Sequence, residues 1–354
     1  MDQRPKENKI CLIYTGGTIG MSRDSNGILH PPPDPNSFLE IAPELKDIAD
    51  FDFVPLMNKD STNIDPSDWI MIANAIYERR NNGYDGFVIA HGTDTMHFSA
   101  SAIALALGEN LKFPVVFTGA QTAPDVPHGD ARVNLLRAFK VSLTELAEVV
   151  ICFGENVFRG CRAQKTDERR FNAFGAPAHF PLAFITEDIQ VNSDIAFERK
   201  EKSNNPDIDL KAAFATGVLQ VSLIPGLEPR LLEHLLHDTE CKGIILQSFG
   251  AGNVPDEYGH SWINFIREAK KRGKPILITS QFPANSTLHT AYAPGCSAVR
   301  AGAIPTSNMT SACATVKFRW VLAQIDEKGL QGQEKLDEIN KMMNTPFVGE
   351  LDLK

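Results

Sequence analysis

The sequence predicts an α/β protein with two α/β domains: a larger N-terminal domain with a mostly parallel mixed sheet, and a smaller Rossmann-like C-terminal domain. Three observations support this prediction. The chain has 354 residues, which is enough for two hydrophobic cores. Short apolar runs alternate with segments of helical periodicity, and this order is typical of parallel strands covered by helices. A polar stretch at residues 197–214 interrupts the alternation before it resumes.

The first predicted strand is residues 9–15, a run rich in branched and aromatic side chains that ends at two glycines. A helix is expected after Asp65, which suits the N-cap position and is followed by Pro66 at the first helical position. A second buried strand, residues 86–94, runs into a glycine-containing turn. The remaining segments of this half are a helix at 97–110 and a strand at 113–121. The segments 130–143 and 148–154 then continue the α/β alternation.

The boundary between the domains is expected where the composition changes. Residues 197–214 are polar and charged and contain an Asn-Asn-Pro break. We therefore expect an N-terminal domain at residues 1–200, a linker at residues 201–216 and a C-terminal domain at residues 217–354. The α/β alternation resumes after the linker at 218–226, 231–237, 242–253, 262–273 and 275–281.

The composition is that of a globular protein with an acidic balance. Hydrophobic residues make up 43% of the chain and charged residues 22%, and the formal net charge is −9. Nucleic acids and anionic membrane surfaces would be repelled by this charge, so neither is expected as a partner. No apolar run approaches the roughly 20 residues of a membrane-spanning helix, and the polar start of the chain gives no signal peptide. A cytoplasmic location is expected.

Cysteine and histidine usage gives no sign of a disulfide framework or a metal site. The six cysteines are scattered, without a C-x-x-C pair or a histidine-rich neighbourhood, so reduced thiols are expected. His91 and His97 are six residues apart, a spacing that does not place both on one helical face for a metal. No metal is expected, and His91 is predicted to be structural.

Two stretches place threonines beside glycines after apolar runs: T-G-G-T-I-G at residues 15–20 and H-G-T-D-T-M at residues 91–96. A dinucleotide fingerprint would need glycine at position 15 and an acidic residue at a strand end about 20 positions later. A P-loop would need Gly-Lys-Ser or Gly-Lys-Thr, but Gly20 is followed by Met21. Both phosphate-binding interpretations therefore fail on specific residues.

Threonine chemistry fits the same stretches better. Ligands of open α/β sheets bind beyond the carboxyl ends of strands, where Thr15 and the Thr93–Asp94 pair are expected. A threonine hydroxyl becomes a nucleophile only with a base beside it and donors for the oxyanion. Glycines such as Gly16 and Gly92 let backbone N–H groups approach a reacting carbonyl. A threonine beside a glycine is more often a turn residue, but two such motifs at two strand ends favour a catalytic site.

The two motifs together resemble the signature motifs of the bacterial-type L-asparaginases, within the asparaginase/glutaminase family, and are most similar to those of its cytosolic type I branch. The resemblance extends through most of the chain. The other segments that fall in the family's order are P-L-M-N-K-D-S-T-N-I-D-P-S-D-W at 55–69, T-G-A-Q at 118–121, G-D-A-R-V-N-L-L-R-A at 129–138, F-R-G-C-R-A-Q-K-T-D at 158–167, G-A-G-N at 250–253 and T-A-Y-A-P-G at 290–295.

The resemblance implies hydrolysis of the side-chain amide of L-asparagine to L-aspartate and ammonia, through a threonine acyl-enzyme and without a metal or organic cofactor. Thr15 matches the family's primary nucleophile. Thr93 and Asp94 match the second motif, and Lys165 matches the family's lysine. A desolvated lysine has a lowered pKa, and a carboxylate can orient it, so Thr93, Lys165 and Asp94 make physical sense as a base relay.

The same resemblance implies how the substrate is held. Asp94 is the expected acceptor for the α-ammonium of L-asparagine, and Ser61, with Thr62 beside it, is expected to bind the α-carboxylate. Ser61 and Thr62 would also suit a helix cap or a turn. Asn253 matches an asparagine that family members supply from a neighbouring subunit, so a homodimer or homotetramer is implied. The expected substrate-binding residues are Gly16, Ser61, Thr62, Gly92, Thr93, Asp94 and Asn253.

Two positions depart from the family's pattern. Many members have a tyrosine in the loop after the first motif, where this chain has Ile28. We hypothesise that Tyr292 replaces it as a catalytic residue, with core packing as the alternative. Residues 22–35, rich in proline, glycine and polar residues, are predicted to form a lid over the substrate. Phe282 stands where some type I enzymes place a cysteine of an allosteric site, so that mode of regulation is not expected.

Two other functions compete with asparagine hydrolysis. One is the asparaginase-like subunit of an archaeal-type tRNA-dependent amidotransferase. That subunit usually carries an additional N-terminal domain, whereas the first motif here begins within fifteen residues of the start. The other is a catalytically inactive amino-acid-binding protein. A binding protein would have no need for Thr15, Thr93, Asp94 and Lys165 together.

Overall fold

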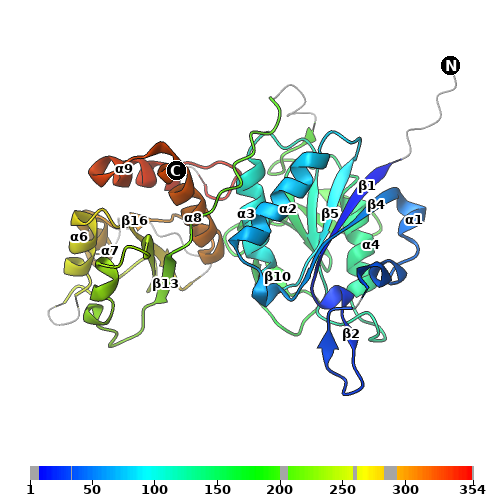
Figure 1. Cartoon of the computed structure of the whole chain (residues 1–354), viewed down its shortest axis with the longest axis horizontal. Helices are drawn as coiled ribbons and strands as arrows, with labels where there is room; N and C mark the ends of the chain where they lie inside the picture. The colour runs from blue at the N-terminus through cyan, green and yellow to red at the C-terminus, as the bar shows by residue number, and fades with distance from the viewer. Residues whose placement is uncertain (1–7, 33, 200–205, 258–260, 283–292, 353–354) are drawn as a thin grey trace. The chain divides into compact units, whose positions relative to one another are not determined.

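The chain, seen in a computed structural model, divides into two units, Met1–Ala212 and Ala213–Lys354, each with its own sheet (Figure 1). The structure describes residues 8–32, 34–199, 206–257, 261–282 and 293–352. The first unit has a mixed sheet and the second a parallel one, so the predicted fold class is confirmed.

An eight-stranded sheet forms the centre of the first unit. Its strands are β1 (Lys9–Gly16), β4 (Asp50–Lys59), β5 (Gly86–Ala90), β6 (Val115–Thr118), β7 (Val149–Phe153), β8 (Asn156–Arg159), β11 (Ala183–Ile185) and β12 (Ile189–Val191). Their order is β12-β11-β8-β7-β6-β5-β1-β4. Strands β7 to β4 pair in parallel, and β8, β11 and β12 extend the sheet with antiparallel pairs. The carboxyl ends of β4, β1 and β5 therefore meet at one edge.

Helices cover both faces of this sheet. They are α1 (Leu45–Ile48), α2 (Pro66–Arg79), α3 (Met96–Leu107) and α4 (Ala131–Val141), with the 3-10 helices η1 (Thr18–Gly20), η2 (Pro35–Glu40), η3 (Ser61–Asn63) and η4 (Gly160–Arg162). Figure 1 shows α2 beside α3 on one face, and α1 with α4 on the other. Helix α2 begins as predicted: the Asp65 side chain accepts from Ser67 N, and Asp68 completes a capping box.

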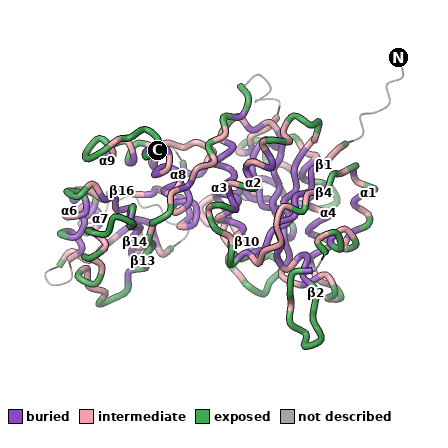
Figure 2. Tube along the Cα trace, viewed as in Figure 1, coloured by how far each residue is buried: buried purple, intermediate pink, exposed green. Residues whose placement is uncertain are grey.

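The core of the first unit explains which way the first motif faces. Side chains alternate along a strand, and Ile10, Leu12 and Tyr14 of β1 join the buried cluster that contains Leu135 and Phe139 of α4. Figure 2 shows that the buried residues follow the strands. Thr15 lies on the opposite side of β1 from Tyr14, at the end of the strand. The sheet thus delivers its hydroxyl toward the face covered by α2 and α3.

Two short hairpins flank this edge of the sheet. The segment predicted as a lid contains one of them, formed by β2 (Ser22–Arg23) and β3 (Leu29–His30). Ile28 lies in its turn with 56% of its surface exposed, and Arg23 makes an ion pair of 3.2 Å with Asp125. The other hairpin pairs β9 (Gln164–Lys165) with β10 (Phe174–Gly175) and carries the lysine singled out in the sequence.

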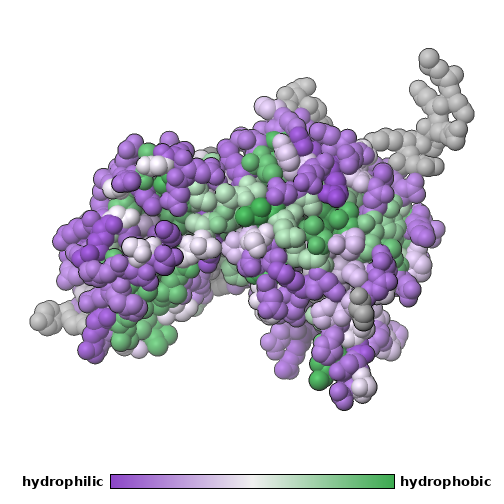
Figure 3. All heavy atoms as spheres, viewed as in Figure 1, coloured by the Kyte–Doolittle hydropathy of each residue, from purple (hydrophilic) through white to green (hydrophobic). Residues whose placement is uncertain are grey.

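The second unit is a parallel four-stranded sheet with helices. Its elements are β13 (Val218–Ser222), β14 (Gly243–Ser248), β15 (Ile276–Ser280), β16 (Ile304–Pro305), α6 (Ile263–Lys271), α7 (Ala293–Ala301), α8 (Ser311–Lys328), α9 (Gly332–Met343), η5 (Pro229–Leu231) and η6 (Glu233–Leu236). The strands follow in sequence order. Ile244 and Ile278 of the sheet pack with Trp262 and Ile266 in one cluster. On the face seen in Figure 3, the surface over α6 is hydrophilic.

No helix within the described ranges has the length and apolar character needed to cross a membrane.

A buried ion pair joins α8 to the end of the chain. Lys317 and Glu350 side chains are both fully buried, and Lys317 Nζ lies 2.6 Å from Glu350 Oε1. Lys317 also donates to the carbonyls of Met343 and Thr345, at 3.0 and 2.7 Å. Glu350 accepts from the backbone N–H groups of Phe347 and Val348. Both charges are therefore fully hydrogen-bonded, which is the condition under which a buried pair is tolerated.

We expect Lys317→Met to lower the free energy of unfolding by about 3–5 kcal/mol, because it leaves the Glu350 carboxylate buried without its partner. The control is Lys328→Met on the same helix, because the Lys328 side chain is half-exposed and losing its pair with Glu338 should change the free energy of unfolding far less. Denaturant unfolding of both variants measures the difference. Equal losses for the two lysines would contradict this account.

Candidate active site

Glycines allow three backbone segments to converge at the carboxyl ends of β1, β4 and β5. Gly16 has a φ of 110° and lies against Lys59, where any Cβ would overlap the Lys59 carbonyl oxygen. Gly17 has a φ of 88° and packs equally closely on the backbone of Gly92, while its N–H donates to Lys59 O at 3.1 Å. Larger residues at these positions would push apart the segments that carry the two threonine motifs.

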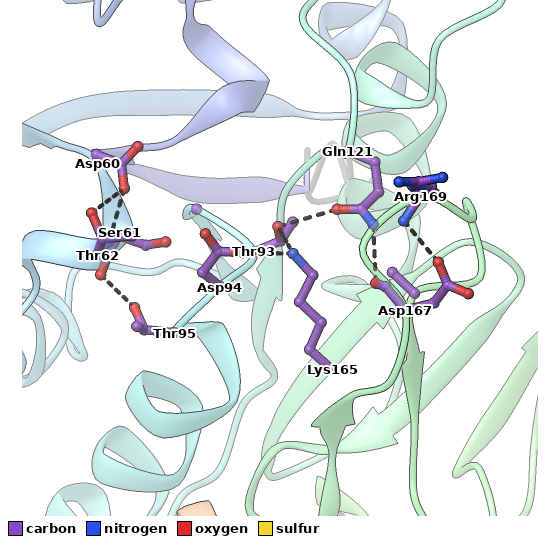
Figure 4. A network of polar contacts seen from close by, with 12 residues as sticks. Asp60, Ser61, Thr62, Thr93, Asp94, Thr95, Gln121, Lys165, Asp167 and Arg169 are labelled. Atoms are coloured by element: carbon purple, nitrogen blue, oxygen red, sulfur yellow. Dashed lines mark hydrogen bonds and ion pairs between the residues drawn. The ribbon is translucent and has the colours of Figure 1, made fainter.

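The turn at Ser61 is held against the same point. The Asp60 side chain accepts from Thr62 N and from Thr62 Oγ1, both at 2.8 Å, and Thr95 Oγ1 donates to Ser61 O at 2.8 Å (Figure 4). Ser61 is 4% exposed, and a Cβ added at Gly92 would lie 2.6 Å from its Oγ. The Ser61 hydroxyl therefore lies next to the second motif.

Lys165 contacts two polar side chains of the second motif, those of Thr93 and Asp94. Its Nζ lies 2.8 Å from Thr93 Oγ1 and 2.6 Å from Asp94 Oδ1 (Figure 4). The Thr93 residue is 6% exposed, whereas the side chains of Lys165 and Asp94 are 15% and 57% exposed. The Thr93 hydroxyl, the Lys165 amine and the Asp94 carboxylate thus form a continuous hydrogen-bonded series, and Asp94 is its solvent-exposed member. This arrangement could activate a hydroxyl or a water molecule.

These groups line a polar cavity of about 330 Å³. Its lining combines carboxylates, a lysine, hydroxyls and backbone at glycines: Gly17, Thr18, Asp60, Ser61, Gly92, Thr93, Asp94, Gln121, Lys165 and Glu168. Among these residues, three carboxylates face one cation, which favours a ligand that carries a positive group. The volume is suited to a small polar molecule.

The structure separates the expected site residues into three groups. Ser61, Gly92, Thr93, Asp94 and Lys165 line the cavity together. Thr15, which is 1% exposed, and its neighbour Gly16 lie behind the lining at the end of β1, and Thr15 Oγ1 donates to Ala90 O at 2.9 Å. Thr62 is tied to Asp60 in the turn and is not part of the lining.

Three further expectations concern the second unit. Asn253 closes a tight turn there, exchanging backbone hydrogen bonds with Phe249. Tyr292 lies outside the described residues. Phe282 is 54% exposed.

The sequence interpretation missed several residues of the cavity. Gly17, Thr18, Asp60, Gln121 and Glu168 were not among the expected site residues, although each lies within or directly beside a motif that carries the resemblance. Their position in those motifs was the available signal. Which of their side chains face the cavity depends on turn geometry that the motif letters do not specify.

Two neutral histidines lie next to the site. His91 is buried, its Nδ1 contacts Gly92 O at 2.7 Å, and burial lowers its pKa from 6.5 to about 4. His97 has its pKa lowered to about 4 by burial and by the positive charge of Lys165. Neither His91 Nε2 nor His97 Nδ1 finds a hydrogen-bond partner in the described part of the chain.

Within the residues that the structure describes, there is no group of three or more metal-ligating side chains.

Comparison with protein families gives two matches. The family model "Asparaginase, N-terminal" matches residues 9–197, and "Glutaminase/Asparaginase C-terminal domain" matches residues 217–332. Among curated proteins, the chain is 31% identical to a glutamyl-tRNA(Gln) amidotransferase subunit of Methanothermobacter thermautotrophicus, over 98% of this chain and 78% of that protein. The protein of the same name from Pyrococcus furiosus is 32% identical over 99% of this chain and 78% of its own length.

Solved structures with the same fold are described as L-asparaginases. The thermostable L-asparaginase from Thermococcus kodakarensis has a TM-score of 0.84 at 28% identity. L-asparaginase I from Vibrio cholerae O1 biovar eltor has a TM-score of 0.83 at 27% identity. Each alignment covers 98% of this chain and 100% of the other. The curated relatives and the solved structures thus differ in the activity that they are named for.

We expect acid to destabilise the protein through His91 and His97. Both are neutral when folded, with pKa values near 4, and regain a pKa near 6.5 on unfolding. The unfolded chain therefore binds more protons between these values. Each histidine's contribution is complete above pH 6.5 and is lost as the pH falls toward 4, by about 1.4 kcal/mol per pH unit.

Urea unfolding of the protein and of His97→Asn between pH 4 and 7 measures this effect. The variant should show a shallower pH dependence, since one of the two titrating groups is gone. His128→Asn, at an exposed position with a φ of 62° that asparagine tolerates, serves as the control. An unchanged slope in His97→Asn would show that His97 is not held neutral.

Proposed function

The chain belongs to the asparaginase family, and we propose that it is an amidohydrolase that converts L-asparagine to L-aspartate and ammonia. The observation that carries the proposal is the bond of 2.8 Å between Lys165 Nζ and Thr93 Oγ1 inside a polar cavity. A lysine joined to a threonine hydroxyl and a carboxylate is an arrangement for proton transfer. A protein that only binds an amino acid has no use for it.

The reaction proceeds as two acyl transfers. A threonine oxygen attacks the side-chain amide carbon of L-asparagine, the C–N bond breaks, and the nitrogen takes up a proton and leaves as ammonia. Water then attacks the resulting ester, which releases L-aspartate and returns the proton to the threonine oxygen. Both steps pass through an oxyanion, and we assign its stabilisation to the backbone at Gly92, because the Gly17 N–H already donates to Lys59 O.

The two threonines take different parts in this scheme. We assign the primary attack to Thr15, whose hydroxyl must exchange its bond to Ala90 O for the substrate. Neutral Lys165 withdraws a proton through Thr93, and Asp94 orients the lysine. The relay thus takes the proton from the attacking group in each step, which is the threonine hydroxyl in the first step and water in the second.

The charges of the cavity suit the backbone end of L-asparagine. We assign the α-ammonium to Asp94, with Asp60 and Glu168 adding negative charge to the same lining. The α-carboxylate is assigned to the Ser61 turn, where the Ser61 hydroxyl lies next to Gly92 in the cavity lining. Asn253, from the second unit of a neighbouring copy, is proposed to complete the site in a homodimer or homotetramer.

One specific observation favours a second candidate. The curated relatives from Methanothermobacter and Pyrococcus carry the name of an amidotransferase subunit, so ammonia release could serve a partner enzyme instead of free asparagine breakdown. In that case ammonia production should depend on the partner and on its tRNA. Turnover by the isolated chain distinguishes the two functions.

We expect Lys165→Met to lower the rate of ammonia release from L-asparagine by about 10²–10⁴-fold, because the base that serves Thr93 is lost. Lys9→Met is the matched control, since Lys9 is also ion-paired, to Asp52 at 2.8 Å, but lies at the other end of β1. An ammonia assay at neutral pH, with L-asparagine and L-glutamine in parallel, gives both rates. Retained activity in Lys165→Met would contradict the proposed relay, and an inactive folded wild-type protein would contradict the function.

A further inference from the structure

We propose that Gln121 is a positioning residue that fixes the Thr93 hydroxyl for catalysis, an inference that rests on the amidohydrolase function proposed above. Gln121 follows β6 in the T-G-A-Q segment and lines the cavity. Figure 4 shows its side-chain amide reaching Thr93 from the side opposite to the Ser61 turn. The contacts of the amide fix its orientation, with the oxygen toward Thr93 and the nitrogen toward two backbone carbonyls.

The Thr93 oxygen has polar partners on two sides. Lys165 Nζ lies 2.8 Å from Thr93 Oγ1, and Gln121 Oε1 lies 3.2 Å from it. A hydroxyl has one hydrogen to donate, and an amide oxygen can only accept. While Lys165 donates to the hydroxyl, its hydrogen must point to Gln121. Gln121 and Lys165 therefore hold the Thr93 oxygen from two sides, and the relay uses this fixed position of the oxygen when the hydrogen passes to neutral Lys165.

The other end of the amide prevents it from turning over. Gln121 Nε2 donates to the carbonyl oxygens of Asp167 and Arg170, at 3.2 and 3.4 Å. Carbonyl oxygens cannot donate, so a flipped amide would lose these bonds and would also present an N–H₂ group to Thr93. The network thus assigns Oε1 to the threonine. Its partners, Asp167 and Arg170, flank the cavity residue Glu168.

The backbone of Gln121 is anchored as firmly as its side chain. Gln121 N donates to Asp130 Oδ2 at 2.9 Å, and Asp130 is 6% exposed at the start of α4. The same carboxylate accepts from Thr122 N at 3.0 Å and from Asn134 Nδ2 at 3.1 Å. Because the backbone and the amide nitrogen of Gln121 are both fixed by hydrogen bonds, its amide oxygen can hold the Thr93 hydroxyl in a productive position. Without it, the Thr93 side chain is free to leave the rotamer that meets Lys165.

Two substitutions distinguish the contribution of the amide oxygen, which accepts from Thr93, from that of the amide nitrogen, which donates to the carbonyls. Gln121→Met keeps the length of the side chain but removes both ends. Gln121→Glu keeps an acceptor for Thr93 and loses the donor to the carbonyls of Asp167 and Arg170. If Gln121 acts through Thr93, Gln121→Met lowers kcat about 10-fold with KM within about 2-fold, while Gln121→Glu retains a higher plateau kcat.

The comparison of the two variants gives a readout that a purely structural role would not produce. Gln121→Glu restores an acceptor for the Thr93 hydroxyl without restoring the donor to the carbonyls of Asp167 and Arg170. A kcat that recovers in Gln121→Glu relative to Gln121→Met therefore shows that the contact with Thr93 carries the effect.

Steady-state ammonia release by wild type and these variants at a series of pH values tests the proposal. Gln190→Met on the exposed edge strand β12 controls for the substitution itself, and thermal unfolding confirms that each variant is folded. A rise in KM with unchanged kcat would make Gln121 a substrate contact and overturn the proposal. So would a plateau kcat of Gln121→Glu at or below that of Gln121→Met. An inactive wild type would instead overturn the proposed function.

Discussion

Gly17 and Gly92 touch backbone to backbone, and this contact sets the geometry of the whole candidate site. It joins the turn after β1 to the turn after β5, so the first and second motifs share one edge of the sheet. Ser61 packs on the same glycine, which brings in the turn after β4. Parallel pairing of β4, β1 and β5 makes such a meeting possible, because all three strands end on the same side. The cavity is the space that remains above these turns.

The polar groups of the site differ in burial and charge, and these differences decide what each group can do. Thr93 and Ser61 are almost fully buried, and the Thr93 hydroxyl is held by Lys165 and Gln121. Lys165 contacts Asp94, whose side chain is the more exposed of the two, so solvent can exchange protons with the proposed relay there. Behind the lining, His91 and His97 stay uncharged because burial opposes protonation. Neutral imidazoles there add no positive charge to compete with the lysine for the nearby carboxylates.

The sequence predicted those parts of the fold that depend on local signals. Apolar runs ending at glycines located β1 and β5, and Asp65 with Pro66 located the start of α2. The antiparallel strands β8, β11 and β12 were not anticipated, because their pairing joins short segments whose register is set by the whole sheet. For the site, the motifs led to Thr93, Asp94 and Lys165, which the structure brings into contact. The bond of Thr15 to Ala90 and that of Gln121 to Thr93 join distant segments, and nothing in a linear pattern specifies them.

A threonine ester formed at this strand edge would react with hydroxylamine as well as with water, so competition between these two nucleophiles reveals it. L-Asparagine and the β-methyl ester of L-aspartate would give the same ester with the enzyme after losing ammonia or methanol. If the ester forms, we expect one ratio of β-aspartyl hydroxamate to L-aspartate from both substrates at a given hydroxylamine concentration. Ratios that differ between the two substrates, or aspartate formed without any hydroxamate, would show that water attacks the substrate directly and that no threonine ester forms.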